Sequence, residues 1–117
     1  MPNTKNGTPE LEGPVRATDL VTIQSAAVVS RTILKKPMGT VTAFAFDAGE
    51  ALSEHTAPFD ALIMGLEGGA DIFISGTPHS VYSGDILRLP AGEPHSVKAT
   101  TPFKMLLVMI KADAQTP

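Results

Sequence analysis

The sequence has 117 residues, enough for one domain with a modest hydrophobic core and too few for two. A formal net charge of -3 argues against a basic nucleic-acid-binding surface, and no segment approaches the roughly 18 consecutive apolar residues of a membrane-spanning helix. The absence of cysteine excludes disulfides and cysteine-bound metals, and the first residues lack a signal-peptide pattern. We therefore expect a cytoplasmic protein without nucleic-acid or membrane partners.

The chain divides by composition into an arm, a domain and a tail. Residues 1–17 contain three prolines, two glycines and few large apolar side chains, so we expect an N-terminal arm or tail. Residues 18–112 are the predicted barrel domain, and residues 113–117 are a predicted C-terminal tail.

Short segments rich in Val, Ile, Thr and aromatic residues predict an all-β domain. The predicted strands are residues 20–24, 26–34, 41–46, 61–66, 71–75, 79–83, 86–89, 96–100 and 103–110. Their spacing of about 8 to 12 residues is typical of a sandwich or barrel. We expect strands 61–66 and 71–75 to form a hairpin, and strand 86–89 to lie beside the strand that follows it.

The last predicted strand, residues 103–110, is apolar on both faces after Lys104. Such a strand should be buried on both sides. A lone small barrel would leave an apolar sheet face and a strand edge in water, so we expect a homodimer.

Two segments each open with a glycine turn and deliver one histidine. Residues 84–95 end on His95, and residues 49–60 contain His55. Alternate residues of a strand share a face, so Lys98, which requires water, places His95 on the interior face. We expect both histidines to start strands and to approach one another inside the barrel.

These segments resemble the two motifs of the small single-domain cupins, of the RmlC-like superfamily with the cupin type-2 conserved barrel. The second motif is matched at Gly84, Pro90, Gly92 and His95, with Ala99 where the family has asparagine. The first motif is kept only at Gly49, His55 and Gly68, while its second histidine falls on Ala57 and its glutamate on Ala61.

The resemblance implies a double-stranded β-helix, the jelly-roll cupin barrel, with a pocket in its middle. In the family, three histidines and a glutamate meet on one divalent metal. This sequence keeps two of those ligands, His55 and His95, so the resemblance implies at most a weakly held iron, manganese, nickel or zinc ion. The alternative is that the two histidines hydrogen-bond to each other or to water.

The leading functional expectation is a barrel that binds a small molecule, such as a carboxylate. The expected ligand-binding residues are His55, Phe59, His95 and Met105. The alternatives are a metal-dependent enzyme, either an oxidoreductase of the dioxygenase type or an isomerase, and a non-catalytic sensor or interaction domain. Whether the protein is an enzyme stays open at this point.

Several further residues are weaker candidates. Asp60 could replace the lost glutamate only if a bulge at Pro58 changed its face, and Glu93 is either a general base or a solvated loop carboxylate. His79 is expected at the surface and Tyr82 at a pocket rim or a half-buried strand. Further candidates for the pocket lining, for which plain core is the commoner role, are Phe44, Phe46, Met64 and Met109.

Overall fold

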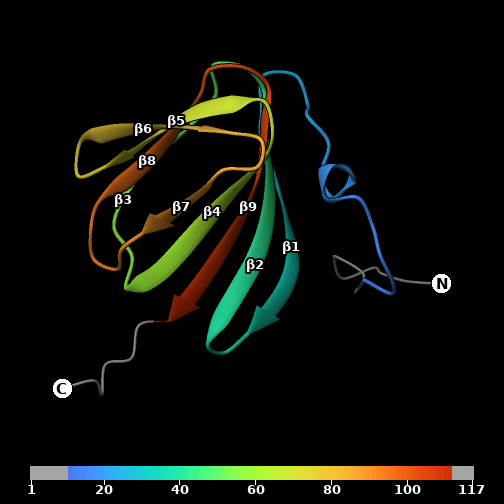
Figure 1. Cartoon of the computed structure of the whole chain (residues 1–117), viewed down its shortest axis with the longest axis horizontal. Helices are drawn as coiled ribbons and strands as arrows, with labels where there is room; N and C mark the ends of the chain where they lie inside the picture. The colour runs from blue at the N-terminus through green and yellow to red at the C-terminus, as the bar shows by residue number, and fades with distance from the viewer. Residues whose placement is uncertain (1–10, 112–117) are drawn as a thin grey trace.

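The computed structural model describes residues 11–111, and within this part of the chain nine strands form two antiparallel sheets that face one another (Figure 1). The five-stranded sheet has the order β1-β2-β9-β4-β7, and the four-stranded sheet has the order β3-β8-β5-β6. The strands are β1 (Val28–Lys36), β2 (Gly39–Phe46), β3 (Ala51–His55), β4 (Phe59–Glu67), β5 (Gly69–Ile74), β6 (Thr77–Tyr82), β7 (Ile86–Leu89), β8 (His95–Ala99) and β9 (Phe103–Lys111). The predicted jelly-roll barrel is confirmed.

The ends of the chain are described only in part. Of the predicted arm, residues 11–16 are exposed and without regular structure, and residues 1–10 lie outside the described residues. The predicted tail, residues 113–117, also lies outside them. Among residues 11–111, no helix is long and apolar enough to cross a membrane.

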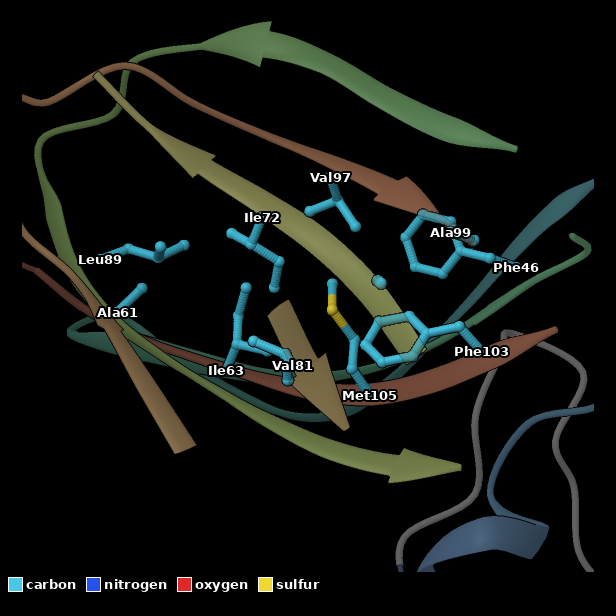
Figure 2. Close-up of a cluster of buried hydrophobic side chains, with 11 residues drawn as sticks. Phe46, Ala61, Ile63, Ile72, Val81, Leu89, Val97, Ala99, Phe103 and Met105 are labelled. Atoms are coloured by element: carbon cyan, nitrogen blue, oxygen red, sulfur yellow. The ribbon is translucent and has the colours of Figure 1, made fainter. Parts of the chain in front are cut away.

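Inward-facing side chains of both sheets meet in one core between the layers (Figure 2). Strand β4 shows the alternation that builds this core, since Ile63 is buried whereas Leu62 and Met64 are exposed on the other face. Phe46 and Phe103 are fully buried, with ring centroids 5.8 Å apart, and fill one end of the barrel. The core thereby closes one end of the barrel and leaves the other available for a pocket.

The predicted strand at residues 20–24 is wrong. Residues Ala17–Asp19 form a single 3-10 turn (η1), and the chain from residue 20 to residue 24 is irregular. Leu20 and Val21 are nevertheless buried, because they pack across the outer face of the five-stranded sheet. The apolar pattern in this segment serves sheet-face packing rather than strand pairing.

Side chains replace the missing strand ladder at this segment. The Arg31 Nη1 donates a hydrogen bond to the Leu20 carbonyl at 3.1 Å, and the Lys104 Nζ donates one to the Thr18 carbonyl at 2.7 Å. Backbone carbonyls near a buried surface require such partners. The two cations therefore fix the segment across the sheet.

The two predicted strand pairings are also wrong. Strands β4 and β5 belong to different sheets, and so do β7 and β8. The chain crosses from one sheet to the other at Gly68, which has a φ of 75° and lies between β4 and β5. Alternation shows which residues share a face, but it does not identify the neighbouring strand.

The corner at Gly68 generates a stability prediction. A Cβ at this residue would collide with the Pro102 carbonyl oxygen, in addition to the cost of a left-handed conformation for a residue other than glycine. We expect Gly68→Ala to lower the free energy of unfolding by more than about 2 kcal/mol, measured by urea denaturation.

Gly49→Ala is the matched control. Gly49 has a φ of 85°, but no atom lies within 4 Å of the position that an added Cβ would take. We expect a loss of about 1 kcal/mol, from the backbone conformation alone. Equal losses at both glycines would show that the close approach to Pro102 is not what constrains the corner.

Candidate functional site

The two histidines meet at the mouth of the barrel. His55 ends β3, His95 begins β8, and the two residues face each other as partners in the antiparallel pairing of these strands. Their ring centroids are 4.3 Å apart, with the rings inclined by 67° in an edge-to-face arrangement. The predicted approach of the rings is confirmed, although His55 ends a strand where the sequence analysis expected it to start one.

An irregularity in β3 turns His55 toward the barrel interior. Leu52 pairs with Val97 and His55 pairs with His95, so three steps along β3 correspond to two steps along β8. This extra residue is a β-bulge, which shifts the alternation of side chains by one position. Leu52 and His55 therefore both line the same pocket, which a regular strand would not allow.

Each imidazole is oriented by a carbonyl two residues before it. The Nδ1 atom of His55 lies 3.1 Å from the Ser53 carbonyl oxygen, and the Nδ1 atom of His95 lies 3.3 Å from the Glu93 carbonyl oxygen. A carbonyl oxygen only accepts hydrogen bonds, so these contacts require the hydrogen to be on Nδ1. A ring in that tautomer has an unprotonated Nε2, whose lone pair can accept a hydrogen bond or bind a metal.

The environment of His95 favours the neutral ring. Partial burial lowers the pKa of His95 below its ordinary value of 6.5, and the nearby His55 lowers it further. The hydrogen bond to the Glu93 carbonyl acts in the opposite direction and is outweighed. His95 is therefore uncharged at neutral pH.

The histidines border a cavity of about 260 Å³ between the sheets. Its other walls are apolar, so the imidazoles are the only polar side chains that line it among residues 11–111. The lining residues are Phe44, Leu52, His55, Ala57, Phe59, Ala61, Ile63, Leu89, His95, Val97, Met105, Leu107 and Met109. The structure thus brings all four predicted ligand-binding residues, His55, Phe59, His95 and Met105, to one cavity.

Some lining residues were missed, and some predicted candidates lie elsewhere. Leu107 lines the cavity together with Met105 and Met109, a set that alternation along the last strand could have identified. Phe44 and Met109 line the cavity as considered, whereas Phe46 is core and Met64 is exposed on the outer face. Ala57, which replaces a family histidine, leaves an apolar wall in its place.

The two candidate carboxylates do not reach the cavity. Asp60 is exposed on the outer face of β4, where its Oδ1 accepts a hydrogen bond from the Ala91 N–H at 3.1 Å. The hypothesis that Asp60 takes the place of the lost glutamate ligand is therefore wrong. Glu93 accepts a hydrogen bond from the Ser75 hydroxyl at 3.1 Å on an exposed loop. Neither carboxylate is among the residues that line the cavity.

The remaining candidates lie on β6, away from the cavity. His79 and Tyr82 are both exposed, as expected for His79. Throughout residues 11–111, no group of three or more histidine, cysteine, aspartate or glutamate side chains is arranged to bind a metal ion. The donor set at the barrel mouth is thus limited to two imidazoles.

No protein-family model and no curated protein matches the sequence. Solved structures do match it over most of its length. A conserved protein of unknown function from Streptococcus pyogenes is 33% identical, covers 91% of this chain and 93% of its own, and has a TM-score of 0.84. A cupin superfamily protein from Desulfitobacterium hafniense is 25% identical, with coverages of 87% and 94% and a TM-score of 0.82.

A third structure is similar over a smaller share of its own length. The cupin 2 conserved barrel domain protein from Leptotrichia buccalis is 38% identical over 80% of this chain, with a TM-score of 0.78. The match spans 46% of the Leptotrichia chain. These similarities and the jelly-roll topology support the resemblance to the cupins that the two glycine-led histidine motifs indicated.

The lowered pKa of His95 leads to a prediction about pH. An NMR titration should give His95 a pKa below 6.5, and His55→Ala should raise it only in part, because burial is the larger cause. As the pH falls, His95 takes up a proton in the unfolded chain before it does so in the folded protein, because its folded pKa is lower. The free energy of unfolding should therefore fall as the pH drops through 6.5 toward the folded pKa. A His95 pKa above 6.5 would contradict the desolvated environment described here.

Proposed function

The chain belongs to the cupin superfamily, and we propose that it binds a small carboxylate with an apolar body in the pocket between its two sheets. The observation that carries this proposal is the composition of the pocket, in which the two imidazoles are the only polar side chains that residues 11–111 contribute to otherwise apolar walls. Ligand sites typically combine apolar walls with a few convergent polar groups.

The size of the cavity limits the ligand. An apolar cavity of about 150 Å³ accepts benzene, so a cavity of about 260 Å³ has room for one ring or a short branched chain with a polar group attached. Phe59 lies near the mouth with the histidines, and Met105 lies deeper in the core. Methionine side chains adapt readily to irregular apolar shapes, which suits the apolar end of such a ligand.

A carboxylate at the mouth requires a positive charge between itself and the two rings. The Nε2 atoms carry lone pairs in the tautomer that the carbonyl contacts impose, and lone pairs repel an anion. A divalent metal bound to both Nε2 atoms would supply that charge, and so would a proton taken up by one ring. Iron, manganese, nickel and zinc all accept imidazole ligands.

The two histidines fit such a metal only in part. Each has the carbonyl contact at Nδ1 that accompanies metal-bound imidazoles, and His55 and His95 would be the protein ligands. Two neutral ligands without a carboxylate neutralise none of the ion's charge, so affinity should be weak. The carboxylate of the bound molecule would complete the site.

We predict that zinc and benzoate strengthen each other's binding. In calorimetric titrations of the full chain, the zinc dissociation constant should fall by about tenfold when benzoate is present, with the reciprocal effect on benzoate. His55→Ala and His95→Ala should each abolish the coupling while the barrel stays folded, since His55 is exposed and His95 is half-buried.

The controls test whether the coupling depends on the charge of the ligand, on the position of the histidine and on the metal. Benzamide has the same ring without the charge and should not couple to zinc, and His79→Ala, an exposed histidine outside the pocket, should leave the coupling unchanged. Benzoate binding that strengthens at low pH without zinc would assign the positive charge to a proton. Tight zinc binding without any anion would favour the dioxygenase-type enzyme instead, and no benzoate binding under any condition would refute the proposal.

A further inference from the structure

We propose that the pocket continues onto the inner face of β1, β2 and the end of β9, and that this extension binds a second carboxylate of the ligand. This second contact extends the function proposed above and rests on it, because the first carboxylate of the ligand binds beside the histidines. We call the extension the hairpin shelf. Its polar side chains are Ser30, Thr32, Lys35, Thr40, Thr42 and Lys111.

The register of the five-stranded sheet places the hairpin shelf directly beside the cavity. Residues opposite one another in an antiparallel pair lie on the same face of the sheet. Thr42 pairs with Leu107, and Thr40 pairs with Met109. Both of these β9 residues line the cavity, so the two threonines continue the cavity wall toward the edge of the sheet.

The hairpin shelf also includes side chains of β1 and the last residue of β9. Thr32 and Lys35 are the β1 partners of the two threonines, and they share a face because of a register shift between residues 32 and 34. Lys111 pairs with Phe59, which lines the cavity, so Lys111 lies on the inner face as well. Two lysines therefore flank the row of hydroxyl groups.

The hairpin shelf is accessible from solvent. The tip of the β1-β2 hairpin extends past the four-stranded sheet (Figure 1), and Thr32, Lys35 and Lys111 are exposed. The expectation that β9 is buried on both faces fails at this end, where Ile110 is 57% exposed. The cavity thus continues into an open polar surface on the side of β1 and β2.

The charges at this end of the sheet favour an anion. Strands β1, β2 and β9 contain five lysine or arginine residues and no aspartate or glutamate, although the net charge of the chain is -3. The one ion pair within residues 11–111 joins Lys104 to Glu67. Lys35 and Lys111 therefore have no carboxylate partner in this part of the chain, and a ligand carboxylate would accept charge-assisted hydrogen bonds from them.

Thr40 gives a second, independent indication of a ligand. Among residues 11–111, its Oγ1 is the one buried side-chain oxygen or nitrogen atom without a hydrogen-bond partner. A buried hydroxyl without a partner costs free energy. In its row, Thr40 lies between Lys35 of the shelf and Met109 of the cavity wall. A carboxylate oxygen bound at this point would accept a hydrogen bond from the hydroxyl.

The two polar ends of the extended site determine the class of ligand. The histidines lie at the barrel mouth, the lysines and threonines lie on the hairpin shelf, and the cavity between them is apolar. Adjacent strands are about 4.8 Å apart, so β2 and β1 lie roughly 5 and 10 Å from β9. The ligand is therefore a dicarboxylate whose two charged ends are separated by an apolar body.

The test compares two ligands that differ only in the second charge. Para-carboxyphenylacetate and para-ethylbenzoate share the ring and the first carboxylate, and only the former carries a carboxylate on its arm. In calorimetric titrations of the full chain with zinc, the dicarboxylate should bind at least about tenfold more tightly. Lys35→Gln and Lys111→Gln should each remove part of this gain, and the double variant should remove most of it.

Lys36→Gln is the matched control. Lys36 is the chain neighbour of Lys35 and is equally exposed, but it pairs with Gly39 and belongs to the opposite face of the sheet. It should leave the tenfold difference unchanged. None of the three substitutions should alter the binding of para-ethylbenzoate, which has no second charge.

Thr40→Val tests the buried hydroxyl through two measurements. The variant should bind the dicarboxylate more weakly, because one hydrogen bond is lost. It should also raise the urea midpoint of the ligand-free protein, because replacing an unpartnered buried hydroxyl with a methyl group removes a desolvation cost. A hydroxyl with a purely structural role would instead give a lower midpoint and unchanged affinity, which would contradict its assignment to the shelf.

The outcomes separate this inference from the function on which it rests. Failure of both compounds to bind would refute the proposed function and the shelf with it. Binding of para-ethylbenzoate with no gain for the dicarboxylate would overturn the shelf alone. A gain that survives in the double lysine variant, or that falls equally in Lys36→Gln, would assign the effect to general surface charge and would also overturn the shelf.

Discussion

The candidate site depends on one extra residue in β3. Between Leu52 and His55, the strand advances three residues while β8 advances two, and this shift turns His55 to the same side as Leu52. Without it, the imidazole would face solvent on the outside of the four-stranded sheet. The Ser53 carbonyl within the bulge also contacts Nδ1 of His55, so one backbone feature sets both the position and the orientation of the ring.

The chemistry of the pocket follows from placing two imidazoles in an apolar wall. Burial lowers the pKa of His95, and the carbonyl contacts orient the unprotonated Nε2 atoms of both rings. Such a pair lacks the charge to bind an anion alone and lacks the carboxylate to bind a metal tightly. The metal would supply the charge that the anion needs, and the anion would supply the carboxylate that the metal needs. We therefore propose that metal and carboxylate bind together. Ala57 and Ala61 account for this difference from the full ligand set that the motifs imply.

The same alternation that lines the pocket also places apolar side chains on the outer face of the five-stranded sheet. Along β9, Leu107 and Met109 face the cavity, whereas Val108 and Ile110 face outward. Strand β4 repeats the arrangement, with Ile63 inward and Leu62 and Met64 outward. The pocket wall and the outer face are therefore the two sides of one sheet.

Much of this architecture could be predicted from the sequence, because side-chain alternation is a local property. Residues 41–46 alternate and residues 103–110 form a continuous apolar run, and the two segments form β2 and β9 nearly as predicted. Because His95 and Lys98 point to opposite faces of their strand, the exposed lysine placed the His95 ring inside. The glycine-led motifs indicated that the two histidines share a site, and their rings lie 4.3 Å apart.

Other features depend on contacts between distant parts of the chain. Alternation does not reveal which strands are neighbours, so the pairing of β4 with β5 and of β7 with β8 was predicted wrongly, and Leu20 and Val21 were assigned to a strand instead of a covering segment. The face of Asp60 and the bulge before His55 depend on register, which is set by partners distant in sequence. Local pattern was thus sufficient for the strands, and the resemblance to the cupin motifs for the barrel and its two histidines. Long-range pairing decided which side chains join the histidines and which sheet face remains open, because those contacts link residues far apart in the sequence.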